Sequence, residues 1–201
     1  MKIYEIGGID NSGKTTQIRE LRKKLNPETV FVPPSLVQYT SKFPQTLKER
    51  VEWYSKGEIE DIVVATFVGA NNRVKEISNR EEDYVLLDRG YLTLNASLIA
   101  RVMLRTKKEF SYAKDFVKEI RNSSEYDRHE NASFLLFFDT DDWMADIEKR
   151  EGDKFHTEFK DYLFLFNECL NRIHHKYENV MALDAQYDPE KITGLILGEI
   201  L

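Results

Sequence analysis

The stretch Gly8-Ile9-Asp10-Asn11-Ser12-Gly13-Lys14-Thr15-Thr16 decides the fold, because it matches the pattern G-x-x-x-x-G-K-[ST] in full. An apolar segment, residues 3–9, runs into it, and an amphipathic segment of helical period, residues 14–25, follows it. Between a strand and a helix this pattern forms a phosphate-binding loop (P-loop), in which glycines let the backbone amides curl around an anion and the helix N-terminus adds its positive end. The alternative, a glycine turn with a surface lysine, does not explain why the motif, the strand and the helix occur together.

The rest of the chain alternates short apolar segments with longer segments of helical period. The predicted strands are residues 3–9, 29–33, 84–88, 133–139 and 180–184, and the predicted helices are 14–25, 59–78, 159–177 and one that begins at Asp188-Pro189. Strands buried on both faces and joined by helices predict an α/β protein with the three-layer P-loop NTPase fold and a mainly parallel five-stranded sheet. No repeat or linker divides the chain, so we expect one domain over residues 1–201.

Composition excludes several classes of protein. The chain has 201 residues, 41% of them hydrophobic, and its 35 acidic side chains outnumber 29 Lys and Arg to give a net charge of −6. This acidic surplus argues against a protein that coats nucleic acid. The longest apolar run, residues 62–70, is far shorter than the roughly 20 residues that a bilayer requires. The single cysteine, Cys169, allows no internal disulfide, and no secretory signal opens the sequence, so we expect a cytoplasmic protein.

In a parallel α/β sheet ligands bind beyond the carboxyl ends of the strands, so the residues after each strand are the candidates for function. Lys14 of the P-loop can reach the β- and γ-phosphates, and the Thr15 hydroxyl can ligate Mg²⁺. Asp88 ends a predicted strand and can hold the same cation, while Arg89 offers a planar fork to phosphate oxygens. The alternative is an aspartate that caps the next helix beside a surface arginine.

Arg73 lies on the edge of an apolar helical stripe, three residues after Ala70 and four before Ile77. An arginine so close to a buried face needs a partner. That partner could be an anionic substrate, or it could be Glu76 or Glu49 in a salt bridge, and the position alone leaves both open.

Residues 143–155 follow the fourth predicted strand and contain the charged run 149–154. Alternating charge is typical of a solvated helix face, but the glycine at position 152 suggests a break, and a basic, breakable segment is also what a closing lid would look like. We therefore predict a lid segment around residues 143–157. None of the four histidines has metal-ligand spacing with other ligands.

The P-loop alone does not identify the reaction, since switches, motors and kinases share it. A guanine-binding switch would need an N-K-x-D segment late in the chain, which this sequence lacks, and the chain is small for a motor. Small nucleotide kinases fit its length.

Six segments in order then resemble the thymidylate kinase family, P-loop kinases that transfer the γ-phosphate of ATP to dTMP. They are GIDNSGKTT at the P-loop, VPPS, ANNR, LLDRGYLTLNAS, REGDKF and a late LDA. The resemblance implies ATP and Mg²⁺ as cofactors, a small-molecule nucleotide as substrate, and a homodimer formed through apolar helix faces such as residues 59–77. It also implies roles for single residues: Asp10 faces the sugar of the acceptor, Arg73 grips its phosphate, and Arg89 bridges the acceptor and donor phosphates. Because Asn11 is uncharged, the basic residue that some members carry in the P-loop would come from the lid, as Lys149, Arg150 or Lys154.

The sequence departs from the family where the acceptor would bind. An arginine is usual near Ser35, an aromatic that stacks on thymine is expected at Gly69, and a second aromatic is expected at Ser97. The family's Asp-Arg-Tyr has become Asp-Arg-Gly at Gly90, and Thr93 stands where serine is common. Loss of stacking rings weakens base binding by about 1–3 kcal/mol per base. A different acceptor, such as a modified nucleotide or a nucleoside, and a catalytically degenerate nucleotide-binding module therefore stay open as alternatives. A nucleoside acceptor would need a carboxylate base after the second strand, and the sequence there offers none.

The sequence predicts ATP-dependent phosphoryl transfer to a nucleoside monophosphate, with dTMP as the leading acceptor. The predicted catalytic residues are Lys14, Asp88, Arg89 and Arg150; those for the nucleotide are Gly8, Asp10, Asn11, Ser12, Gly13, Lys14, Thr15 and Thr16; those for the acceptor are Asp10, Ser35, Gly69, Arg73, Arg89, Thr93 and Ser97; and those for the metal are Thr15 and Asp88.

Overall fold

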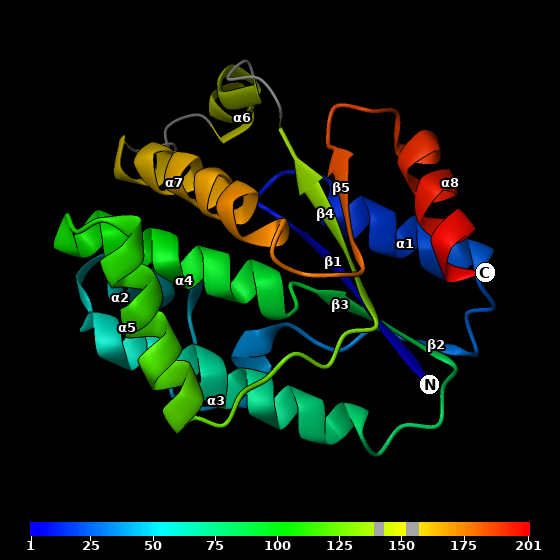
Figure 1. Ribbon diagram of the computed structural model, residues 1–201, viewed down its shortest axis with the longest axis horizontal. Coiled ribbons are helices and arrows are strands. Elements are labelled where there is room, and N and C mark those ends of the chain that lie inside the picture. The colour runs from blue at the N-terminus through cyan, green and yellow to red at the C-terminus, as the bar shows by residue number, and fades with distance from the viewer. Residues whose placement is uncertain (139–142, 152–156) are drawn as a thin grey trace.

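The computed structural model describes residues 1–138, 143–151 and 157–201. Within them a five-stranded sheet runs in the order β2-β3-β1-β4-β5, and all neighbouring strands are parallel (Figure 1). The strands are β1 (Lys2–Gly8), β2 (Val30–Phe31), β3 (Tyr84–Asp88), β4 (Ala132–Phe137) and β5 (Val180–Asp184). The predicted three-layer α/β fold with a parallel five-stranded sheet is confirmed.

Helices cover both faces of the sheet. On one face α1 packs against α8, and on the other α4 packs against α7 and α5, with α3 beside them (Figure 1). The helices are α1 (Lys14–Lys24), α2 (Leu47–Lys56), α3 (Ile59–Ile77), α4 (Tyr91–Thr106), α5 (Phe110–Ser123), α6 (Trp143–Glu151), α7 (Thr157–His174) and α8 (Pro189–Ile200), with a 3-10 helix, η1 (Leu36–Tyr39).

Most predicted elements are present with ends that differ by three residues or fewer. The second strand is the exception, since the predicted segment 29–33 contributes only β2. This strand lies at the edge of the sheet, and Pro33 and Pro34, which have no backbone N–H, follow shortly after it. The predicted end of the fourth strand, at position 139, lies outside the described residues.

Two long helices, α4 and α5, were not among the predicted elements. Eleven of the sixteen residues of α4 are buried, so the helix has no broad polar face. Its burial between α5 and α7 instead makes it a central element of the second layer.

The topology brings the predicted functional segments together. β1 and β3 are neighbours in register, with Ile6 opposite Asp88, so the P-loop after β1 starts beside the residues that follow β3. β4 borders β1 on its other side, with Gly8 opposite Leu136. The carboxyl ends of the three central strands therefore define the edge at which a ligand would bind.

Two features of the helices bear on a possible dimer and on membrane insertion. Several of the apolar residues of α3, which we expected to form a dimer contact, are buried within the chain itself, including Ile62, Val63 and Phe67. Ile59, Val64, Val68 and Val74 of the same helix are only half-buried. Among the described residues, no helix is both long enough and apolar enough to span a bilayer.

Candidate active site

The P-loop has the backbone of an anion cradle. Gly8 and Gly13 have φ angles of 134° and 91°, in the left-handed region that favours glycine, and a Cβ on Gly8 would lie 2.6 Å from the carbonyl oxygen of Leu136. Gly13 is the N-cap residue of α1, and no side chain caps that helix. The first amides of α1 are therefore open to a bound phosphate.

Lys14 is buried at the start of α1, with only 6% of its surface exposed. Its Nζ donates to the carbonyl oxygen of Ile9 at 2.5 Å. Burial, together with the charge of Arg89, lowers the pKa of the Lys14 amine to about 8, although Asp10 and Asp88 pull it upward. A phosphate at this position would supply the negative charge that the buried ammonium lacks.

The polar atoms around Lys14 fit a nucleotide phosphate with its cation. Ser12 Oγ is buried and has no hydrogen-bond partner among the described residues. Thr15, on the first turn of α1, and Asp88, at the end of β3, are both exposed, while Thr16 is half-buried. A hydroxyl and a carboxylate are ligands that Mg²⁺ takes together with phosphate oxygens and water. The described residues hold no group of three or more His, Cys, Asp or Glu side chains that could bind a metal alone.

Asp10 of the P-loop forms an ion pair with Arg89, the residue after β3. Burial would raise the pKa of the Asp10 carboxyl, but the nearby charges of Arg89, Lys14 and Arg101 outweigh it and hold that pKa below its usual value. The backbone of Arg89 has a φ of 62°, which is unusual for a residue with a side chain. This ion pair therefore joins a residue of the P-loop, predicted to bind ATP, to an arginine predicted to contact the acceptor phosphate.

Arg73 lies behind this pair rather than beside it. The side chain is 3% exposed, and its fork donates to two main-chain carbonyls, those of Arg89 at 2.7 Å and of Asp88 at 3.4 Å. Glu76, one of the partners that the sequence left open, instead accepts from Tyr39 and Arg80. In this structure Arg73 therefore supports the backbone of the site.

The other predicted acceptor residues lie in different surroundings. Ser35 is exposed before η1, and Gly69 packs against that helix, where a Cβ would lie 3.3 Å from the carbonyl oxygen of Leu36. Thr93 is fully buried. Ser97 shares a hydrogen bond of 2.7 Å with the Tyr162 hydroxyl. A side chain at the position of the family's first stacking ring would thus be tightly packed against η1.

Aromatic side chains that the sequence reasoning missed lie against Arg101 and Arg89. The guanidinium of Arg101 lies 4.4 Å from the ring centroids of both Tyr54 and Tyr162, and that of Arg89 lies 5.9 Å from the ring of Phe166. We call Tyr54, Arg101, Tyr162 and Phe166 the ring cluster. Its members come from α2, α4 and α7. One signal was available, because Arg101 is a charged residue inside the apolar segment that forms α4, one turn after Ser97.

The lid prediction is only partly covered by the structure. Residues 143–151 form α6, and Lys149 is exposed on it. Lys154 and the side chain of Arg150 lie outside what the structure describes.

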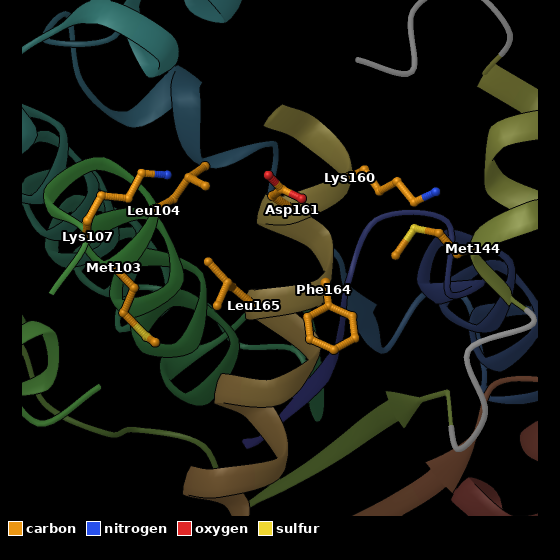
Figure 2. Close-up of a pocket in the computed structure, with 8 residues that line it drawn as sticks. All are labelled: Met103, Leu104, Lys107, Met144, Lys160, Asp161, Phe164 and Leu165. Atoms are coloured by element: carbon orange, nitrogen blue, oxygen red, sulfur yellow. The ribbon is translucent and has the colours of Figure 1, made fainter. Parts of the chain in front are cut away.

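A separate pocket of about 390 Å³ opens where α4, α6 and α7 approach one another (Figure 2). It is lined by Met103, Leu104, Lys107, Met144, Lys160, Asp161, Phe164 and Leu165. None of the predicted site residues whose side chains the structure describes lines it, so this pocket is distinct from the phosphate site.

The chain and its fold were compared with known proteins. No family model matches the chain. A probable thymidylate kinase of Methanococcus vannielii is 30% identical over 158 residues, which cover 77% of this chain and 69% of that protein. Among solved structures, a thymidylate kinase from Candida albicans aligns with a TM-score of 0.72 at 17% identity, over 99% of this chain and 90% of the other. A deoxyadenosine kinase from M. mycoides with bound dATP aligns with a TM-score of 0.71 at 16% identity, over 100% and 99%. The structural likenesses show that the fold is that of P-loop kinases, and the sequence relative shows that this chain belongs to the thymidylate kinase family.

Proposed function

We propose that this protein transfers the γ-phosphate of ATP to a nucleoside monophosphate and that dTMP is its leading acceptor. The observation that carries the proposal is the placement of Lys14 and of the Asp10–Arg89 pair at the adjoining carboxyl ends of β1 and β3. A buried lysine on an open helix N-terminus suits the donor phosphates, and an arginine next to it suits the phosphate that accepts.

The chemistry needs positioning more than proton transfer. An oxygen of the acceptor phosphate attacks the γ-phosphorus, the bond to the leaving ADP oxygen breaks, and no strong base is required because the acceptor is already ionised at pH 7. Lys14 and Arg89 would neutralise the charge that builds on the transferred group. Mg²⁺, held by Thr15 and Asp88, would add charge neutralisation on the phosphate oxygens. Lys149, Arg150 or Lys154 of the lid would supply a further cation.

The base of the acceptor is assigned to the ring cluster. Stacking rings are absent at Gly69 and Ser97. Phe166 of α7 instead lies against Arg89, and Tyr54 of α2 and Tyr162 of α7 lie against Arg101, with Tyr162 and Phe166 buried. A base that lies against these rings would stay in line with Arg89. Since this arrangement departs from the family pattern, a modified nucleotide is the second candidate for the acceptor.

The acceptor prediction is tested by a coupled ADP-release assay over all nucleoside monophosphates and nucleosides. We expect turnover with monophosphates, with the highest kcat/KM for dTMP, because the site offers cations to a phosphate, while the Asp10 carboxylate is paired with Arg89 and that of Asp88 is assigned to Mg²⁺. Turnover on nucleosides alone would contradict the proposal. ATP binding without ADP release on any acceptor would favour the degenerate nucleotide-binding module.

Replacing Tyr162 by alanine is expected to raise KM for the acceptor by about tenfold, since base–aromatic stacking contributes about 1–3 kcal/mol. KM for ATP should stay unchanged, because the P-loop is not touched. The matched control is Tyr187→Ala, which removes an exposed ring on the segment before α8, where it contacts Lys191. Equal changes in both KM values would place Tyr162 outside the acceptor site.

Three properties stay predictions from the sequence and the family: the lid at residues 143–157, a cytoplasmic location and a homodimer. Light scattering of the purified protein measures its mass in solution and decides the oligomeric state.

A further inference from the structure

The first turn of α4 is capped by two carboxylates from other parts of the chain. Its N-cap residue, Gly90, has no side chain, yet all four amides of residues 90–93 have acceptors. Glu5 of β1 accepts from the amides of residues 90, 92 and 93 at 2.9–3.3 Å, and Glu130, which precedes β4, accepts from that of Tyr91 at 2.7 Å. Both side chains are buried, with 0% and 9% of their surface exposed. Carboxylates at this place also meet the positive end of the helix dipole.

The residue immediately before this turn is Arg89, whose backbone has the left-handed φ of 62°. Such a conformation in a residue with a side chain persists only where the surroundings hold it. Here the amide of Arg89 donates to Ile6 at 3.3 Å, and its carbonyl accepts from Arg73 at 2.7 Å. On the C-terminal side of Arg89, the next four amides, those of residues 90–93, donate to Glu5 and Glu130. The backbone of Arg89 is thus restrained in both directions.

The space occupied by Glu130 accounts for the glycine at position 90. A methyl group there would overlap Glu130 Oε1 and lie 3.0 Å from Glu5 Cβ. The backbone of Gly90, with a φ of −95°, is one that any residue can adopt. Lack of room, rather than conformation, therefore requires glycine where the family has tyrosine.

We propose that Glu5 and Glu130 are positioning residues for phosphoryl transfer, which hold the first turn of α4 so that the Arg89 guanidinium stays against Asp10 at the P-loop. This inference rests on the proposed function. Neither carboxylate touches the reacting atoms, and both act through the backbone that carries Arg89.

The charges around Glu130 indicate which substitution at this position preserves the capping of α4 by Glu5 and Glu130. Burial and the nearby charge of Glu5 raise the pKa of Glu130 to about 7. Burial and the charges of Glu130 and Glu5 raise the pKa of the Tyr126 hydroxyl, so this ring also lies near both carboxylates. The amide of His129 donates to Glu130 at 3.2 Å. A neutral side chain with an acceptor oxygen is therefore suited to this position, and Glu130→Gln keeps it.

The test is a double-mutant cycle between Glu130 and Arg89, read in ADP release and in the affinity for tripolyphosphate, which carries the charges of ATP without a base. Glu130→Ala should lower kcat by about tenfold and weaken tripolyphosphate binding by about threefold, since a poorly held arginine loses part of its interaction with phosphate. Glu130→Gln should stay within about twofold of the wild type in both. The variant that combines Arg89→Met with Glu130→Ala should be no worse than Arg89→Met alone, because Glu130 acts only through Arg89.

The control is Asp188→Ala, which removes the carboxylate cap of α8 on the opposite face of the sheet. It should lower stability and leave kcat unchanged. If Glu130→Ala does not fold, Gly90→Ala displaces the same contact without deleting a polar group and should give the same loss.

Wild-type values in Glu130→Ala, or losses that multiply in the double variant, would overturn the inference. A wild-type protein that releases no ADP with any acceptor would instead refute the proposed function. In that case the cycle in tripolyphosphate affinity still decides whether Glu130 positions Arg89.

Discussion

Replacing Lys14 by methionine is expected to lower kcat by at least about a thousandfold, the effect of losing roughly 4 kcal/mol of transition-state stabilisation. Lys14 lies on the first turn of α1, buried among Asp10, Asp88 and Arg89, where a transferred phosphate would meet it. Methionine keeps the length and the apolar stem of the side chain and removes only its charge. The measurement is the ADP-release assay with ATP and the best acceptor. Full turnover in this variant would refute the mechanism.

The same substitution should make the protein more stable at pH 7, by about 3 kcal/mol where the lowered pKa reflects the cost of the buried charge. The folded pKa of about 8 lies below the ordinary value of 10.5. The unfolded chain therefore holds more protons between these pH values, and wild-type stability rises with pH across that interval. The advantage of Lys14→Met is greatest below pH 8 and shrinks as the pH approaches 10.5.

Urea unfolding at pH 7 and pH 10 measures this difference. Lys24→Met is the matched control, since Lys24 is exposed at the end of the same helix and its charge has no burial cost. A variant at position 14 that is less stable than the wild type at pH 7 would show that Lys14 contributes to the fold as well as to the site.

Replacing Arg89 by lysine is expected to lower kcat by at least about a hundredfold, because a compact ammonium cannot offer the planar fork that reaches two phosphate oxygens at once. The ion pair with Asp10 and the contact with Phe166 hold the guanidinium at the edge of the P-loop. The matched control is Arg80→Lys, which changes an arginine on the segment after α3, where it contacts Phe31 and pairs with Glu76. That control should turn over at the wild-type rate, and equal losses in the two variants would contradict a specific role for Arg89.

Arg89→Met has a second consequence, for the stability of the protein in acid. In the wild type the charge of Arg89 helps to hold the pKa of Asp10 below 3.8, so the pair stabilises the fold above that pH and the contribution is lost as the pH falls. Without the arginine, less positive charge opposes the effect of burial, so the pKa of the Asp10 carboxyl rises and the loss of stability on acidification becomes smaller than in the wild type. Urea unfolding of the variant and the wild type between pH 3 and pH 6, roughly the range in which carboxyl groups titrate, measures this difference in the pH dependence of stability.

The P-loop could be predicted because all of its determinants are contiguous. Gly8 and Gly13 take the left-handed backbone that the curve needs, and Lys14 opens the helix that follows, so a local pattern carries the whole geometry. Asp88 was also predictable, since the carboxyl ends of parallel strands lie at one edge of the sheet. The proximity of Asp88 to the P-loop follows from the register of β1 and β3.

The direction of a side chain was harder to predict. The position of Arg73 on its helix indicated a buried or half-buried arginine in need of a partner, and left the partner open. The structure pairs it with the carbonyls of residues 88 and 89, which no spacing within α3 encodes. A lone charged residue inside an apolar strand, Glu5, was a comparable signal for a buried carboxylate with partners elsewhere.

By itself the sequence determined the α/β fold, the phosphate loop, the edge of the sheet at which chemistry is proposed, and family membership, because each depends on local backbone chemistry or on the order of segments. Only the tertiary structure decided which side chains surround the Asp10–Arg89 pair and what holds Arg89 in place. The ring cluster needs three helices to meet, and the cap of α4 needs Glu5 and Glu130 to approach from segments far apart in the chain. Such contacts arise when distant segments pack together, and no pattern along the chain specifies that packing.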